Sequence, residues 1–176
     1  MAQPTDQLTP IADDFFARDA TVVAPLLIGA TLVLGHRAVR ISEVEAYTND
    51  DPASHSYRGR TARNAVMFGP SGVLYVYLIY GLHHCLNVVT GTEGDGQAVL
   101  IRAGLIDGVD ARSTRGPGRL AKVVGADLTW NGRAVRGFIH ISAGNDDVGL
   151  GEVLVTPRVG ITKAADLLRR WVVVAQ

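Results

Sequence analysis

The sequence has a single cysteine and no excess of charge of either sign. Cys85 has no second thiol to pair with, so a disulfide within the chain is excluded, and a small buried residue in a strand is favoured over a nucleophile. Seventeen basic and seventeen acidic residues cancel. The composition therefore lacks the overall basic signal of many nucleic-acid-binding proteins, and any attraction for phosphates must come from local clusters.

Long apolar runs are missing as well. The longest one near the start, Val22 to Leu34, is too short to span a bilayer and lacks the charged beginning of a signal peptide. We therefore expect a soluble cytoplasmic protein with no membrane contact. The sequence also lacks a phosphate loop, a dinucleotide fingerprint, a serine nucleophile elbow and a zinc-deaminase signature, so few reaction classes remain.

The sequence does contain enough apolar material for one domain, since 47% of its 176 residues are hydrophobic. Its patterns predict an α+β fold that follows a polar N-terminal segment, residues 1–20, with some disorder. Helices are predicted within residues 11–17, over 22–28 up to Gly29, and within 112–124, where Gly116 and Pro117 mark a start. The predicted strands are residues 31–34, 36–47, 74–80, 86–89, 98–102, 138–142, 153–157 and 171–174.

The segment HRAVRISEVEAY, residues 36–47, alternates as a β-strand does. Unbroken alternation places Glu43 and Glu45 on the same face as the apolar Val39 and Ile41. Burial there raises the pKa of a carboxyl group toward the range of a general base, which makes Glu45 a candidate catalytic residue. The alternative, that one or both carboxylates simply face solvent, stays open.

Three of the five tyrosines lie in one segment, LYVYLIYGLHHCLNVV, residues 74–89. Gly81 interrupts this run of strand-forming residues, which predicts a β-hairpin. Tyr75 and Tyr77 share one face of the first strand, whereas Tyr80 has the opposite parity and reaches the turn. A pocket with a wedge beside it is what an enzyme needs to extrude a base from duplex DNA, although half-buried tyrosines are also ordinary in a sheet.

Residues 48–64 show no periodicity and predict a long loop of the kind that carries function. This loop contains His55 and several arginines, and basic residues gather again over 112–122, although such clusters are also common on solvated surfaces. His83 and His84 are neighbours on a predicted strand, so their side chains point to opposite faces and do not favour a shared metal ion.

Five motifs together resemble the alkyladenine (3-methyladenine) DNA glycosylase family: EVEAY, ASHSYRGRTARNAVMF, LYVYLIYGLHHCLNVVT, AVLIRA and GPGRLAKVVG, in this order and spacing. The resemblance runs from about Thr21 to the C-terminus. It implies that residues 21–176 are a DNA glycosylase domain. It also implies a single compact α+β domain, with a mostly antiparallel, curved β-sheet and flanking helices, like the C-terminal domain of formyltransferases.

The resemblance also implies roles for individual residues. Glu45 would activate the attacking water, with Arg102 close to that water. Base contacts fall on Tyr47, His55, Tyr77 and Asn87, insertion into DNA on Tyr80, and DNA-backbone contacts on Arg58, Arg60, Arg63 and Arg119. The sequence departs from the family pattern at Leu82, at His83, at Arg119 and in the C-terminal TKAADLLRRWVVV.

The implied activity is hydrolysis of the N-glycosidic bond of alkylated or deaminated purines, such as 3-methyladenine, 7-methylguanine, hypoxanthine and ethenoadenine. No lysine lies in the matched catalytic motifs to form a Schiff base, so we expect a monofunctional enzyme without metal or cofactor. Its expected partners are double-stranded DNA and, downstream, enzymes that process abasic sites, and we expect a monomer. Two alternatives are a non-catalytic nucleic-acid-binding module and a small-molecule hydrolase that uses Glu45.

Overall fold

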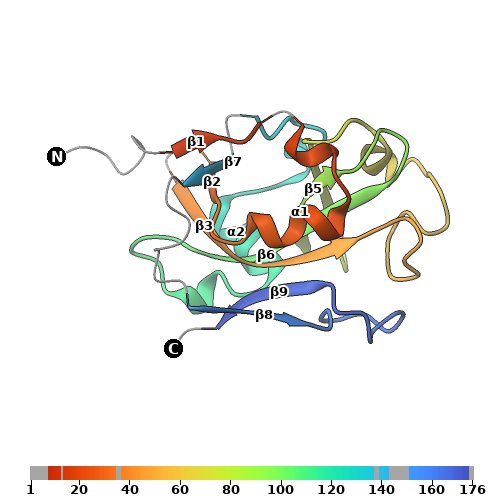
Figure 1. Ribbon diagram of the computed structural model, residues 1–176. Helices are drawn as coiled ribbons and strands as arrows, with labels where there is room; N and C mark the ends of the chain where they lie inside the picture. Colours follow the sequence, from red (N-terminus) through yellow and green to blue (C-terminus); the bar gives the residue numbers. More distant parts are fainter. Residues whose placement is uncertain (1–7, 13, 35–36, 137–138, 143–150, 175–176) are drawn as a thin grey trace.

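The computed structural model describes residues 8–12, 14–34, 37–136, 139–142 and 151–174, and all structural statements below concern these residues. They form one curved sheet of nine strands in which every pair is antiparallel (Figure 1). The strand order is β1-β7-β2-β3-β6-β5-β4, and β9 pairs with both β3 and β8. The bounds are Leu8–Pro10 for β1, Thr31–Leu34 for β2, Arg37–Tyr47 for β3, Leu74–Ile79 for β4, His83–Thr90 for β5, Gln97–Leu105 for β6, Ile139–Ser142 for β7, Glu152–Thr156 for β8 and Arg170–Val174 for β9.

Two α-helices pack against this sheet, α1 (Ala20–Leu27) on β3 and α2 (Pro117–Val124) on β5. Asp19 caps α1, because its carboxylate accepts the Thr21 N–H at 2.8 Å. Proline begins α2, and Gly125 ends it with a φ of 74°. Four short 3-10 helices complete the chain: η2 (Phe15–Ala17), η3 (Ala65–Phe68), η4 (Ala111–Ser113) and η5 (Leu128–Trp130). Neither α-helix of the described residues is long and apolar enough to cross a bilayer.

The predicted α+β class and the curved antiparallel sheet are confirmed, with differences in the elements. The helix predicted within residues 11–17 is only the 3-10 turn η2, and the one predicted within 112–124 is divided into η4 and α2. The helix predicted over 22–28 begins two residues earlier. Phe138, the first residue of one predicted strand, and residues 1–7 of the predicted polar segment lie outside the described residues.

The continuous alternation predicted for β3 is wrong, because the register between β3 and β6 shifts on both sides of Glu43. An irregularity of this kind exchanges the two faces of a strand. The main core cluster accordingly takes residues of both parities from β3: Val39, Ile41, Val44 and Ala46. Glu43 and Glu45 therefore lie on the face opposite to the core, where the site is built, and not on the face of Val39 and Ile41.

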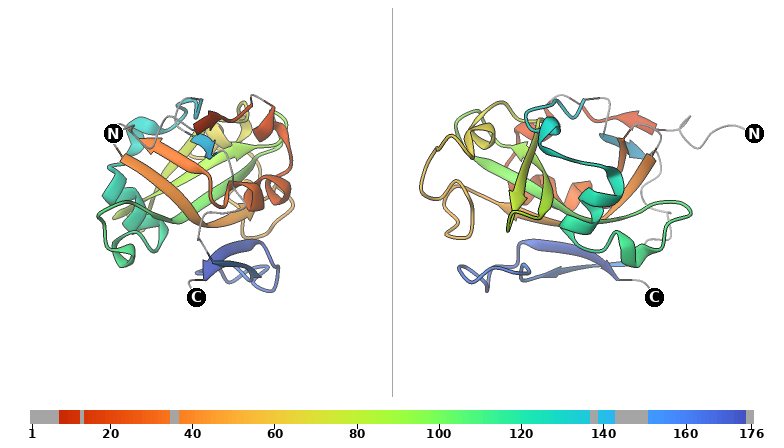
Figure 2. Two further views of the ribbon diagram at one scale, coloured as in Figure 1. Left: turned by 60° about the vertical axis from the view of Figure 1, so that its left-hand side comes forward. Right: turned by 180° about the vertical axis from the view of Figure 1, so that it is seen from behind.

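The same division holds for the neighbouring strands. Leu86 and Val88 of β5 enter the main core cluster, whereas Asn87 between them lines a pocket on the other side. Figures 1 and 2 place the loop after β3 and the loop between β8 and β9 at the same end of the molecule. The site forms between the polar face of the sheet and these two loops.

Candidate active site

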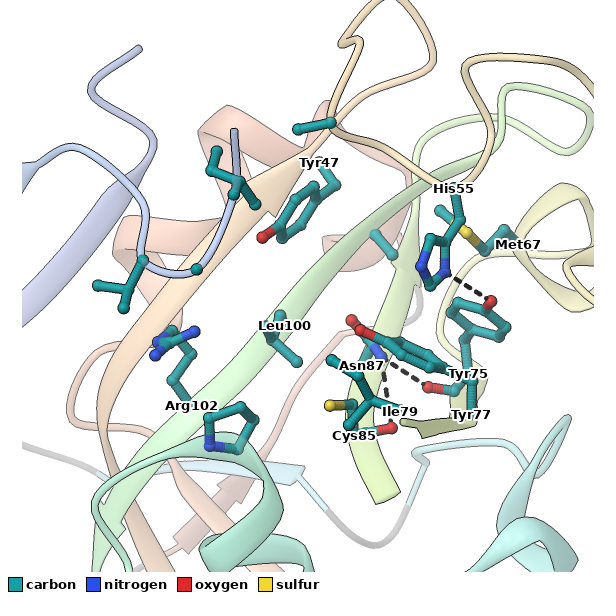
Figure 3. Close-up of a pocket in the computed structure, with 16 residues that line it drawn as sticks. Tyr47, His55, Met67, Tyr75, Tyr77, Ile79, Cys85, Asn87, Leu100 and Arg102 are labelled. Carbon is teal, nitrogen blue, oxygen red and sulfur yellow. Dashed lines mark hydrogen bonds between the residues drawn. The ribbon is translucent and has the colours of Figure 1, made fainter. Parts of the chain in front are cut away.

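A pocket of about 190 Å³ lies on the polar face of the sheet (Figure 3). Its walls come from β3, β4, β5 and β6, from the two loops at this end of the molecule, and from the start of α2. The polar and aromatic lining residues are Tyr47, His55, Tyr75, Tyr77, Cys85, Asn87 and Arg102. The fold therefore brings together five residues for which the sequence analysis gives a role: Tyr47, His55, Tyr77, Asn87 and Arg102. Glu45 lies directly behind Tyr47 and Arg102.

Glu45 is fully buried, and both of its carboxylate oxygens have donors. The Val159 N–H donates to Oε1 at 2.8 Å and the Tyr47 hydroxyl donates to Oε2 at 2.8 Å. Arg102 approaches Oε2 less closely, with 3.4 Å between the charged atoms. The Glu45 carboxylate is therefore held in one orientation by two donors and by the charge of Arg102, beside the wall of the pocket.

Arg102 is fixed by a second carboxylate, Glu43. Glu43 Oε1 accepts from Arg102 Nε at 2.8 Å and from Arg170 Nε at 2.6 Å. Although burial lowers the pKa of Arg102, the charges of Glu45 and Glu43 raise it above its ordinary value. Arg102 is thus a permanent cation in the wall of the pocket, next to Glu45. The role of Glu43 and Arg170 in holding it was not predicted from the sequence.

Aromatic rings face one another across the pocket. Figure 3 shows Tyr47 on one side and His55 with Tyr75 and Tyr77 on the other. The centroids of the His55 and Tyr77 rings lie 4.5 Å apart at an interplanar angle of 69°. Burial raises the pKa of Tyr47 and of Tyr77 well above the ordinary value, so both hydroxyls keep their protons. The space between these rings suits a flat base.

His55 is held by Tyr75, whose hydroxyl lies 3.0 Å from Nδ1 of the imidazole. Burial raises the pKa of Tyr75 to about 12. His55 stays partly exposed, but the loss of water on its covered side and then the charge of Arg63 lower its pKa, so the neutral imidazole is favoured. The loop that carries His55 is fixed in turn by Asn64, which donates to the His55 backbone oxygen at 2.8 Å.

Asn87 is buried at the floor of the pocket. Its Nδ2 donates to the backbone oxygen of Tyr75 at 3.0 Å and to that of Cys85 at 3.5 Å. The amide nitrogen is therefore turned to the backbone, and the amide oxygen is the atom that remains for a ligand. The thiol of Cys85 is buried beside it, and burial raises its pKa, which agrees with a packing role rather than with a nucleophile.

Tyr80 lies at the tip of the β4–β5 hairpin, outside the pocket. Its side chain is 85% exposed, and its φ of 51° is unusual for a bulky residue. Gly81 follows with a φ of 68°, and the Leu82 N–H closes the turn on Ile79 O at 3.1 Å. Helix α2 supports this hairpin from the side, because a Cβ on Gly118 would lie 2.9 Å from His83 Cβ.

Basic side chains gather in two hollows. Arg58 and Arg63 line one of them beside His55, and both are exposed, as is Arg60. Arg119 lines the other, together with Arg37, Arg112 and Lys122. The sequence analysis did not predict that Arg37 joins this basic cluster, because no local pattern indicates that the start of β3 lies close to α2. No group of three histidine, cysteine, aspartate or glutamate residues in the described part of the chain is arranged to hold a metal ion.

The sequence patterns also did not predict that the segment after β8 contributes to the site. Arg158 is buried, its guanidinium carbon lies 4.6 Å from the centre of the Tyr47 ring, and it forms an ion pair with Asp51. The next residue, Val159, supplies a donor to Glu45. A lone arginine in a proline- and glycine-containing loop gives no periodic signal from which this placement could be predicted.

Comparison with known proteins assigns the chain to a family. Residues 14–176 match the profile of the family described as methylpurine-DNA glycosylase. A protein of Methanoculleus marisnigri named "Putative 3-methyladenine DNA glycosylase" is 47% identical, over 89% of this chain and 91% of the relative. A protein of the same name from Rhodopseudomonas palustris is 48% identical, over 89% of this chain and 83% of the relative. Another from Frankia casuarinae is 43% identical, over 93% of this chain and 88% of the relative. The chain therefore belongs to the methylpurine-DNA glycosylase family, whose members hydrolyse N-glycosyl bonds.

Proposed function

We propose that this protein is a monofunctional DNA glycosylase that extrudes a damaged purine from duplex DNA and hydrolyses its N-glycosidic bond. The observation that carries the proposal is the buried Glu45 carboxylate directly behind the wall of an aromatic pocket. The proposed substrates are alkylated or deaminated purines, of the class of 3-methyladenine, 7-methylguanine, hypoxanthine and ethenoadenine. The enzyme would act as a monomer in the cytoplasm and leave abasic sites to other enzymes.

The chemistry asks for one carboxylate. When the base leaves with the bonding electrons, the sugar becomes positively charged. A base alkylated at N3 or N7 is a cation and leaves as a neutral molecule, whereas hypoxanthine or ethenoadenine leaves as an anion that takes up a proton from solvent. Glu45 takes a proton from water as the oxygen of that water bonds to the sugar carbon, and its charge stabilises the cationic sugar. Arg102, which lines the pocket and lies 3.4 Å from Glu45 Oε2, would be close to that water.

The base would be held between the rings. Tyr47 covers one face of the base, and Tyr77 with His55 covers the other. The Asn87 side chain, fixed by two backbone oxygens, would crowd the exocyclic amine of guanine and so favour adenine-like bases. Outside the pocket, the exposed Tyr80 ring would fill the gap that the extruded nucleotide leaves in the stack.

Phosphates would be held on both sides of this wedge. We propose DNA-backbone contacts for Arg58, Arg60 and Arg63 on the loop after β3, and for Arg119 at the start of α2. Figure 2, in its right-hand view, shows that loop and α2 on opposite sides of the β4–β5 hairpin. The two basic surfaces explain how a chain without net charge attracts DNA, and contacts of this kind weaken as salt rises.

The two alternatives are less well supported by the site. A binding module has no use for a buried carboxylate, because burying a charge costs free energy that stacking does not require. A hydrolase of small molecules has no use for an exposed tyrosine in a strained turn or for basic hollows around it.

The experiment is a gel assay of base release from a duplex with one hypoxanthine, under single-turnover conditions. We expect the wild type to produce an abasic site that breaks only after hot alkali, because the mechanism contains no step that cuts the strand. Glu45→Gln keeps the shape but removes the proton acceptor, and it should lower the rate by roughly two to four orders of magnitude. Excision by Glu45→Gln within threefold of the wild type would refute the assignment.

A further inference from the structure

Arg158 is the cation behind the Tyr47 ring, and it is held in one position by buried contacts. Its side chain and that of Asp51 are both fully buried and form a forked ion pair. Nη2 donates to Asp51 Oδ1 at 3.0 Å, and Nη1 donates to Asp51 Oδ2. Nη1 also donates to the backbone oxygen of Ala46 at 3.0 Å. An arginine fork of this kind matches a carboxylate in a single geometry.

From this position Arg158 acts on two residues of the site. Tyr47 lines the pocket and Arg158 does not, so the guanidinium covers the Tyr47 ring from outside the cavity, in a cation–π contact. The next residue, Val159, donates its N–H to Glu45 Oε1, and Tyr47 donates its hydroxyl to Oε2. One short stretch of chain thereby fixes both the ring that stacks on the base and the carboxylate that activates water.

We infer that Arg158, held by Asp51, is a positioning residue for the glycosylase reaction. It touches neither the base nor the water. It holds the plane of the Tyr47 ring and, through Val159, the Glu45 carboxylate before the damaged base arrives, so that these groups need no rearrangement in the transition state. The inference rests on the proposed function, since Glu45 and Tyr47 have these roles only in a glycosylase.

Four variants test it on the full chain. Arg158→Met removes the cation, and Arg158→Lys keeps the charge without the fork or the flat face. The double variant Asp51→Asn with Arg158→Met removes both buried charges and avoids an unpaired carboxylate. The matched control is Arg169→Met, because Arg169 contacts the same Asp51 carboxylate at 3.4 Å and donates to Thr48 at 2.6 Å, whereas the cation–π contact with the Tyr47 ring is made by Arg158.

The measurements are the single-turnover rate on a hypoxanthine duplex at saturating enzyme, the half-saturating enzyme concentration and the melting temperature. We expect Arg158→Met and the double variant to lose about 30-fold or more in rate, while half-saturation changes less than about threefold because the phosphate contacts remain. Arg158→Lys should recover part of the rate and stay about tenfold below the wild type. Arg169→Met should stay within about threefold even where it lowers the melting temperature.

Two results would overturn the inference: excision by Arg158→Met and the double variant within threefold of the wild type, or an equal loss in Arg169→Met. Glu45→Gln is assayed beside them to separate the two proposals. If Glu45→Gln excises hypoxanthine at the wild-type rate, the proposed function fails. If Glu45→Gln is inactive and Arg158→Met is fully active, only the positioning role of Arg158 fails.

Discussion

The two parts of the site differ in how firmly they are held. The Glu45 carboxylate is fully buried, and partners from three chain segments, β3, β6 and the loop after β8, converge on it. At the hairpin tip, Tyr80 is almost fully exposed on a backbone with positive φ. The difference fits the two roles proposed for Glu45 and Tyr80, because a catalytic carboxylate must be in place before the substrate arrives, whereas a wedge finds its packing partners only in DNA.

The largest effect on the exposed side is expected for Tyr80→Ala. Without the ring, the extruded nucleotide leaves an empty gap in the stack, so the flipping equilibrium shifts back by a few kcal/mol and excision from duplex falls by roughly 10- to 100-fold. The same lesion in single-stranded DNA needs no wedge, and its excision should change far less. The measurement is single-turnover release from both substrates. An equal decline on both would make Tyr80 an ordinary residue of the hairpin.

On the buried side, Glu43→Gln should have an intermediate effect. The sequence analysis assigns no role to Glu43, but the structure shows it holding Arg102 and Arg170 through one oxygen. A neutral amide weakens both charge-assisted bonds, and we expect single-turnover excision to fall by about tenfold with DNA binding retained. The control is Glu93→Gln, on an exposed loop, which should behave as the wild type. If the two variants are indistinguishable, Arg102 does not depend on Glu43.

A smaller effect, and a gain rather than a loss, is expected for Asn87→Ser. The shorter side chain removes the group that would crowd the exocyclic amine of guanine, so slow release of normal guanine from undamaged or mismatched duplex should appear. Release is followed by alkali-induced breaks at guanine positions over hours. If no guanine is released while hypoxanthine excision persists, the floor of the pocket is not arranged as proposed.

The smallest effect concerns pH and the histidine at the pocket mouth. Burial and Arg63 lower the pKa of His55 in the folded protein below its ordinary value. The unfolded chain therefore binds this proton first as pH falls, and the folded state loses stability as pH drops from neutrality through the ordinary range of histidine, ~6.5. Urea unfolding at pH 7.5 and pH 5.5 should show a smaller loss for His55→Gln than for the wild type. Equal losses would mean that His55 titrates normally when folded.

Local periodicity predicts the faces of the first hairpin strand, whereas the roles proposed for Tyr47, His55 and Asn87 come only from the resemblance to the glycosylase family. Alternation within residues 74–80 places Tyr75 and Tyr77 on one face and Tyr80 at the turn, as the structure has them. The faces of β3 were predicted wrongly, because the irregularity at Glu43 depends on pairing with a strand about 60 residues away. Arg158 and Arg170 were missed for the same reason, since ion pairs between distant loops leave no periodic signal.

The most direct test of the account uses a duplex with one ethenoadenine, whose fluorescence changes as the base leaves the stack. Glu45→Gln and Tyr80→Ala are compared with the wild type in the same stopped-flow experiment, with excision measured in parallel. We expect Glu45→Gln to give the wild-type flipping signal without releasing the base, whereas Tyr80→Ala should lose most of that signal. A Glu45→Gln protein that excises normally, or a Tyr80→Ala protein that flips the base as well as Glu45→Gln does, would contradict the account.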